Sequence, residues 1–411
     1  MKQNPVPARR LITIILIAVA AWFGFISWRS GMRTAPDVET YSQWADILIA
    51  DHFNYFAFSR DAAFVVPPYL YSGWVTVVAV SKLALGPNWP KGIVALNYTL
   101  MLLSICLQLK LVNRITGSRV CVIASGALAL VAYELFSWIH FPLSDVSFMA
   151  LTFAVFYLLC DLPENRAHRF TSARFGLLVL LVLVIMFYRP TGFPLLVIVP
   201  LALWLHHKVG LSTTQLRARF TKRASLAIGV LIIITLFIHS YFMMTPSAWP
   251  FRFASSWVGQ LSLEYHSGMV VTARPETYTE NPTSLFNFAA VTLRKLGYFF
   301  AVYLRGFSLA HKLANVVFFF PVYGLSLIAV YELFRSNSKL GREAWWAGWL
   351  ALVWIISYAA FHALQQIDYD WRYRLTIMLP LIILASVGLR SLLAVFFHSF
   401  PAESKQCNVT S

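Results

Sequence analysis

The sequence has few charged residues and few cysteines, and both shortages limit what the protein can be. Only 12% of the 411 residues are charged, against about 25% in a soluble domain, whereas 59% are apolar. The four cysteines show neither a disulfide framework nor metal-ligand spacing. No segment has the composition of a soluble domain, so we expect one integral membrane domain over residues 1–411.

Most of the apolar residues lie in runs of close to 20, the length that crosses about 30 Å of hydrocarbon as a helix. The first run follows basic residues, as in a signal peptide, but it is long and lacks a clean cleavage site, so we expect a retained helix. The stretch 175–206 is too long for one helix, and Pro190 and Gly192 at its centre predict two short helices. The other clear runs are 11–28, 92–110, 119–138, 145–161, 225–244, 314–333, 344–362 and 375–396. The sequence thus predicts an all-α polytopic membrane protein with about ten transmembrane helices, within a range of 8–12.

Two further apolar stretches, 63–85 and 286–308, can be either spans or interfacial helices. If neither spans, both termini are cytoplasmic and four short inner loops carry fourteen Lys and Arg residues, as the positive-inside rule requires. We therefore expect both stretches to be juxtamembrane helices on the outer face, within the long loops 29–91 and 245–313. The net charge of +16 then reflects topology and contact with anionic membrane lipids, and we expect no nucleic-acid partner.

In this topology the outer face carries eleven of the seventeen acidic residues and both long loops. Loops longer than about 12–15 residues are usually functional, and the inner loops are short. We therefore expect the active site on the periplasmic or extracellular side of a cell membrane, either the plasma or the inner membrane.

The first outer loop begins with an acidic residue in a helical spacing. Asp37, Tyr41 and Ala45 lie four residues apart, which places them on one face of a helix. A carboxylate near the membrane interface can accept a proton from a hydroxyl or an amine. It can equally cap the helix that follows Pro36, and the spacing alone does not decide between a catalytic base and a cap.

The cations near the outer face also have two interpretations. Arg189, Arg372 and Arg374 are placed to bind a phosphate, which arginine does in bidentate fashion. Alternatively, Arg189 caps a turn, and the other two arginines anchor the interface by pairing with Asp368 and Asp370.

Two more ionisable residues stand out. Glu134 lies inside an apolar run, where a charge is costly and usually functional, although it can instead bond to a neighbour such as Tyr133 or a serine. His140, close to Asp145 in the sequence, is a candidate proton carrier, but a lone interfacial histidine is more often structural.

Several short motifs occur along residues 11–390, and all fall on the expected outer side. Asp37 opens the first long loop, and Leu143-Ser144-Asp145 precedes an apolar helix. The others are Val66-Pro67-Pro68-Tyr69-Leu70, Arg189-Pro190-Thr191-Gly192 and Asp370-Trp371-Arg372-Tyr373-Arg374. Together they resemble the GT-C superfamily of polyprenyl-phosphate-sugar-dependent glycosyltransferases, in particular the protein O-mannosyltransferases and the lipid A aminoarabinose transferases.

The resemblance implies transfer of a sugar from a polyprenyl-phosphate donor to a lipid, glycan or protein acceptor on the outer face, with inversion at the anomeric carbon. It implies that Asp37 and Asp145 are catalytic. The substrate-binding residues expected with them are Glu39, Tyr41, Arg189, Arg372, Tyr373 and Arg374. No cofactor is certain, but if the two aspartates lie close together, a divalent cation such as Mg²⁺ or Mn²⁺ can bridge them.

One departure from the family is that Val38 separates Asp37 from Glu39, where members often have two adjacent acids. Two alternative functions stay open. An O-antigen polymerase or ligase also concentrates arginines in long outer loops, but lacks an aspartate at the very start of the first loop. A lipid-linked glycan flippase or transporter tends to show internal repeats and charges in mid-helix, and we find no convincing repeat here.

Overall fold

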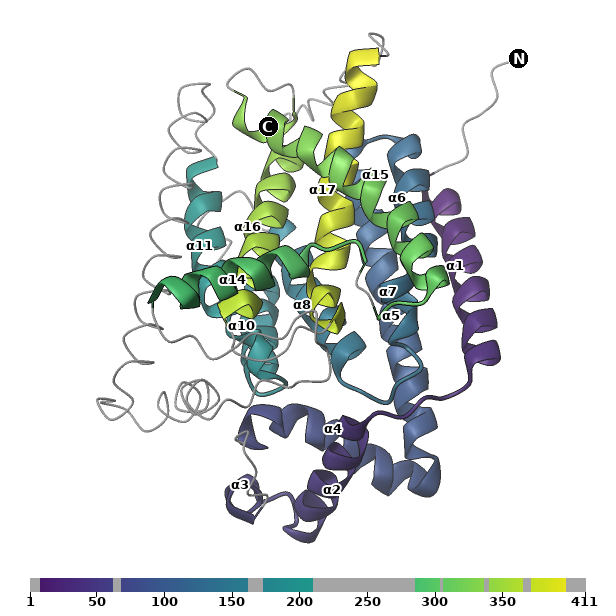
Figure 1. Ribbon diagram of the computed structural model, residues 1–411, viewed down its shortest axis with the longest axis vertical. Coiled ribbons are helices and arrows are strands. Elements are labelled where there is room, and N and C mark those ends of the chain that lie inside the picture. Colours follow the sequence, from purple (N-terminus) through teal and green to yellow (C-terminus); the bar gives the residue numbers. More distant parts are fainter. Residues whose placement is uncertain are drawn as a thin grey trace, which may run out of the picture.

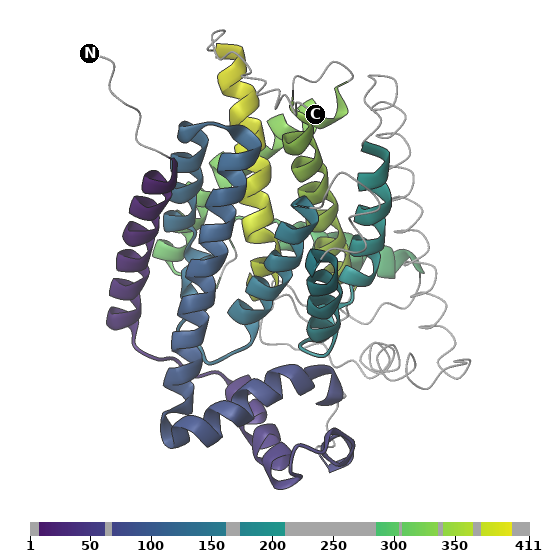
Figure 2. The same cartoon turned by 180° about the vertical axis from the view of Figure 1, so that it is seen from behind.

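The computed structural model in Figure 1 describes residues 8–61, 68–161, 173–209, 285–303, 306–335, 340–364 and 371–396. Within these ranges all regular elements are helices and no strand is found, which confirms the all-α class. Helices run side by side as a bundle, and a small group of helices covers one end of it (Figures 1 and 2).

The bundle helices coincide with the apolar runs of the sequence. They are α1 (Ala8–Ser30), α5 (Trp89–Thr116), α6 (Arg119–Val131), α8 (Asp145–Cys160), α10 (Ala173–Met186), α11 (Leu195–Val209), α15 (Leu309–Phe334), α16 (Arg342–Leu364) and α17 (Leu375–Phe396). Five helical segments of the described chain are long and apolar enough to cross a membrane, and four shorter apolar helices accompany them. The protein therefore has the build of an integral membrane protein. The run 225–244 lies outside the described residues, so the number of ten spans stays a prediction.

One of the five long segments, Ser72–Thr116, is 45 residues long, which would make about 68 Å of continuous helix. It bends instead at η2 (Gly86–Asn88), where Gly86 has a φ of +53°, a value that favours glycine. The bend separates α4 (Ser72–Leu85) from α5, and α4 lies across the bundle rather than along it (Figure 1). This orientation fits the expectation of an interfacial helix for 63–85, of which residues 63–67 lie outside the described residues.

The group of helices at the end of the bundle consists of α2 (Pro36–Ala50), α3 (Tyr55–Asp61), η1 (Pro68–Tyr71) and α4, and we name it the cover layer. The Lys82 ammonium fixes α4 to α2 through bonds of 2.6 Å to the Asp46 carboxylate and 2.9 Å to the Ser42 hydroxyl. The Gly73 amide donates to the Phe187 carbonyl at 2.8 Å, which joins the cover layer to the end of α10. We name this end of the bundle the covered end, and the opposite one the open end.

Two connections at the covered end differ in how well the sequence predicted them. The stretch 175–206 folds as two helices, α10 and α11, around the turn η3 (Pro190–Gly192), as predicted. The prediction of one helix over 119–138 is wrong, because α6 ends at Val131 and the short helix α7 (Tyr133–Ser137) follows after a break at Ala132, whose ψ is 82°. The break at Ala132 turns the charged side chain of Glu134 toward other polar groups of the bundle.

The second expected juxtamembrane stretch, 286–308, contains α14 (Leu285–Phe299), which lies across the bundle against α16 (Figure 1). The loop 245–313 that holds it lies largely outside the described residues.

Candidate functional site

Four segments that are far apart in the sequence bring charged side chains to the covered end. They are the first turn of α2, the first turn of α8, the turn between α10 and α11, and η5 (Trp371–Arg374), which leads into α17. The sequence analysis predicted catalytic or binding residues in each of these four segments. The structure therefore brings Asp37, Asp145, Arg189 and Arg372 to one end of the bundle.

The most exposed ion pair of this site joins the first turn of α2 to η5. The Arg372 guanidinium donates to the Asp37 carboxylate at 2.7 Å (Nη1 to Oδ2), and the two side chains are 19% and 40% exposed. Asp37 does not cap α2, because the N-cap residue is Ala35 and no side-chain bond closes that end. Since both partners reach the surface, an anionic ligand can reach the arginine, and a polar ligand can reach the carboxylate.

The second pair is buried. The Arg189 guanidinium lies 2.5 Å from the Asp145 carboxylate (Nη1 to Oδ1), with 8% and 5% of the side chains exposed, and it also lies over the Phe148 ring. The turn that carries Arg189 requires glycine at position 192, because a Cβ there would lie 2.8 Å from the Ile185 carbonyl oxygen. The chain thus reverses tightly enough to direct Arg189 toward the start of α8.

Two tyrosines of the cover layer complete the cluster. The rings of Tyr41 and Tyr71 lie 5.7 Å apart, centroid to centroid. Burial raises the pKa of both phenols, and both hydroxyls also sense the charges of Asp37, Arg189 and Arg372. The phenols therefore stay protonated at neutral pH and can donate hydrogen bonds. Tyr71 was missed by the sequence analysis, although it follows directly on the Pro67-Pro68-Tyr69-Leu70 motif.

Of three further predicted binding residues, Glu39 and Arg374 do not face this cluster, whereas the Tyr373 ring lies 5.8 Å from the Arg372 guanidinium. Glu39 is exposed on α2, and its carboxylate forms no hydrogen bond or ion pair that involves the described residues. The Tyr373 ring stacks on His362 at 4.6 Å with nearly parallel planes. Arg374 is buried in an ion pair with Glu134. Their direct contact with a substrate stays a prediction that the geometry does not favour.

The described carboxylates at the covered end do not have the arrangement of a divalent-cation site. Among the described residues no group of three or more His, Cys, Asp and Glu side chains is placed to hold a metal ion. Asp37 and Asp145 each face an arginine rather than one another. These two carboxylates do not form the oxygen cage that Mg²⁺ or Mn²⁺ requires, so a bridging cation stays a prediction.

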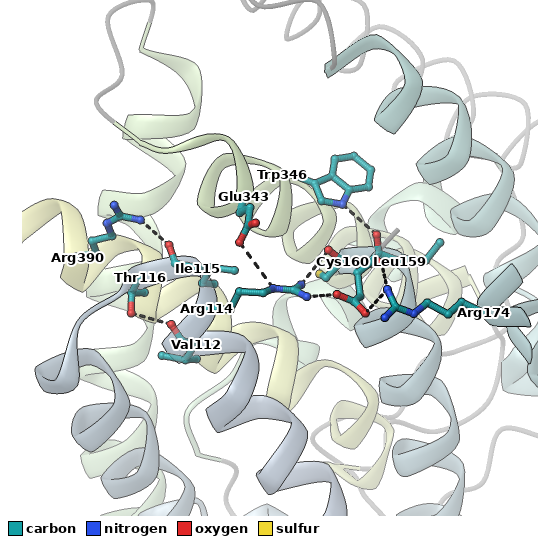
Figure 3. A network of polar contacts seen from close by, with 11 residues as sticks. Val112, Arg114, Ile115, Thr116, Leu159, Cys160, Arg174, Glu343, Trp346 and Arg390 are labelled. Atoms are coloured by element: carbon teal, nitrogen blue, oxygen red, sulfur yellow. Dashed lines mark hydrogen bonds and ion pairs between the residues drawn. The ribbon is translucent and has the colours of Figure 1, made fainter. Parts of the chain in front are cut away.

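A second network of charges lies at the open end, and none of the predicted site residues belongs to it (Figure 3). Asp161 binds two arginines there, Arg114 and Arg174, the latter at 2.9 Å. Arg114 also donates to the Cys160 carbonyl at 2.9 Å, at the end of α8. Arginine donors that satisfy the last carbonyls of a helix are a common way to anchor its C-terminus. The arrangement in Figure 3 is thus typical of a structural anchor.

Comparisons with known proteins add nothing to this picture. No protein-family model matches the chain, and neither the curated proteins nor the solved structures include a match. The functional assignment therefore depends on the chemistry of the residues at the covered end.

Proposed function

We propose that the protein is a membrane glycosyltransferase, which transfers a sugar from a polyprenyl-phosphate donor to an acceptor at the covered end. The supporting observation is the convergence of Asp37, Asp145, Arg189 and Arg372 from four distant segments onto that end. Sugar transfer from a lipid phosphate needs a carboxylate base and cations at one place near the membrane surface. The motif resemblance to GT-C enzymes adds to this argument, and with it the outer side of the membrane as the side of the covered end.

Arg372 has the properties of a phosphate ligand. Its side chain is partly exposed, and a guanidinium can grip two phosphate oxygens at once. A donor phosphate that binds Arg372 takes the place of the Asp37 carboxylate as its partner. Asp37 is then released beside the bound donor, where a base is required.

The proposed reaction is a single displacement. The acceptor oxygen or nitrogen attacks the anomeric carbon, its proton passes to Asp37, and the bond between that carbon and the phosphate oxygen breaks. The leaving polyprenyl phosphate keeps the electron pair, so its charge grows by one unit. Arg372 stabilises this new charge, as positioned cations do at phosphoryl oxygens. Attack from the side opposite the leaving group inverts the anomeric centre.

The buried pair of Arg189 and Asp145 supports the proposed site without direct contact with the reacting groups. Arg189 keeps its charge within electrostatic range of Tyr41, Tyr71 and Arg372. Asp145 neutralises Arg189 on the other side, which makes the burial of this cation tolerable. We assign Asp145 the task of holding Arg189, and Asp37 the task of proton acceptor.

The test is transfer activity in reconstituted membranes with a panel of polyprenyl-phosphate sugars. Asp37→Asn should lower transfer by about a hundredfold or more, with donor binding and folding intact. The matched control is Glu343→Gln, which neutralises an exposed carboxylate at the open end and should leave transfer unchanged. An active Asp37→Asn enzyme would favour a polymerase or ligase without this base. A wild-type protein that transfers nothing would direct attention to flipping of labelled lipid-linked glycans.

A further inference from the structure

A third ion pair lies deeper than the two at the proposed site. The Arg374 guanidinium binds the Glu134 carboxylate, and their side chains are only 1% and 0% exposed. Asn315 of α15 donates to the same carboxylate oxygen at 3.1 Å. The pair therefore joins α7 and α15 to the start of α17, three elements that are far apart in the sequence.

The other contacts of Arg374 bring in a fourth segment. Its guanidinium donates to the Ala301 carbonyl, just after α14, and lies 4.6 Å above the Phe319 ring. A carboxylate, a carbonyl and an aromatic face thus surround one cation. The position of Arg374 is fixed from three directions.

Arg374 is the last residue of the short 3₁₀ helix η5, and the first residue, Trp371, is fixed as well. The Trp371 ring lies 4.7 Å from the Trp138 ring and 4.9 Å from the His311 ring. In a 3₁₀ helix, residues three apart lie on the same side. The two ends of η5 are therefore held in the bundle, and Arg372 between them reaches out to Asp37.

Stability alone does not explain why a charge pair occupies this buried position. Removing two charges from water is costly, and a buried pair can often be replaced by apolar residues of similar size without loss of stability. Buried ionic groups are better explained where they fix one arrangement among several. Here the arrangement that is fixed is the orientation of η5.

We propose that Glu134 is a positioning residue of the site. Through Arg374 it holds η5 in the orientation in which Arg372 meets Asp37. Glu134 is not one of the reacting groups and acts on η5 through Arg374. The inference rests on the proposed function, because the site it positions is the proposed one.

The experiment uses two variants, because a single variant can lose activity simply by failing to fold. Glu134→Gln removes the charge but leaves Arg374 buried. The double variant Glu134→Met with Arg374→Met replaces both charges with apolar side chains of similar length, which favours folding. Both are made in the full-length protein, and folding is checked by thermal unfolding in detergent. Glu343→Gln is again the control.

A crosslinking experiment measures the proximity of positions 37 and 372 independently of activity. Asp37 and Arg372 are replaced by cysteines in a background whose four native cysteines are alanine, and a short bifunctional thiol reagent joins them. With Glu134 present the crosslink should form efficiently. In folded Glu134→Gln or in the double methionine variant its yield should drop at least fivefold. In proteins with Asp37 and Arg372 intact, the same changes should lower kcat/KM for the donor at least tenfold.

Each outcome bears on the proposal. A double methionine variant that folds, crosslinks and transfers like its parent would overturn it. So would the failure of both variants to fold, because the pair would then be a requirement of folding. If Asp37→Asn proves active, the proposed function fails, yet the crosslinking result still decides whether Glu134 orients η5.

Discussion

The two ends of the bundle use the same side chains, aspartate and arginine, in different ways. At the open end one carboxylate, Asp161, is shared by two arginines, and the donors also bind helix carbonyls (Figure 3). At the covered end Asp37 and Asp145 each have their own arginine, in separate pairs that join distant segments. Shared charges near water anchor helix ends, whereas separate pairs hold individual cations in place. The difference indicates that the arrangement of the charges, not composition, distinguishes a candidate site from an anchor.

The largest expected effect tests the burial of the covered end. Asp145→Asn leaves Arg189 buried without its counter-charge, which should lower stability by about 3–5 kcal/mol. Asp161→Asn should have a smaller effect, because both of its arginines keep access to water. Thermal unfolding of both variants in detergent measures the contrast. Equal losses would mean that the two ends do not differ in the way proposed.

The next effect separates function from stability within the covered end. Arg372→Gln should lower kcat/KM for the donor about 30- to 100-fold, or about 2–3 kcal/mol, while the unfolding temperature barely changes. The reason is that the Asp37–Arg372 pair is partly exposed and contributes little to folding. Arg372→Lys keeps the charge but cannot bind phosphate in bidentate fashion. Its kcat/KM should lie between those of the wild-type protein and Arg372→Gln. A destabilised Arg372→Gln protein with full activity would make this pair an anchor instead.

A pH titration offers a further contrast, because the covered end holds a buried histidine. Burial lowers the pKa of His140, and the nearby Arg33 cation lowers it further. The unfolded chain therefore binds the proton more readily, so stability is present above the ordinary histidine pKa of about 6.5 and is lost as the pH falls below it. His140→Gln should flatten the fall in unfolding temperature between pH 7.5 and pH 5.5. An unchanged slope would show that His140 does not contribute to it.

The smallest effect is expected at the open end. The Arg174 side chain is 56% exposed, so Arg174→Gln should cost less than about 1 kcal/mol. High salt should remove even this difference, since exposed charges are screened. Unfolding at low and at high ionic strength provides the measurement. A large loss that persists in salt would indicate that the network in Figure 3 is more than an anchor.

The sequence predicted most helices because a membrane span is a local property. The runs 145–161 and 375–396 correspond closely to α8 and α17, since about 20 apolar residues have few other options. The turn between α10 and α11 was equally predictable from its proline and glycine. These helices and this turn can be predicted without knowing which elements pack against them.

The pairing of the charges was not predictable in the same way. Asp37 and Arg372 are 335 residues apart, and no local pattern connects them. A bond to a neighbour in sequence was one of the two interpretations of Glu134, but its carboxylate binds Arg374 and Asn315, from distant segments. The proposed pairing of Arg372 and Arg374 with Asp368 and Asp370 involves acids outside the described residues. Side-chain partners across a bundle depend on how helices pack, which the apolar pattern of one sequence does not specify.

The length of α5 has a consequence for the substrate. Its 28 residues span about 42 Å, roughly 12 Å more than the hydrocarbon layer, and its first turns reach the cover layer (Figures 1 and 2). In the proposed topology this excess length would bring Asp37 and Arg372 to the depth of the lipid headgroups. Moving each methylene group of a lipid tail into water costs about 0.8 kcal/mol, and a site at this depth avoids that cost entirely. Under the proposed function, carriers with short and long polyprenyl tails should therefore react at similar rates, with tail length affecting only how firmly they stay in the bilayer.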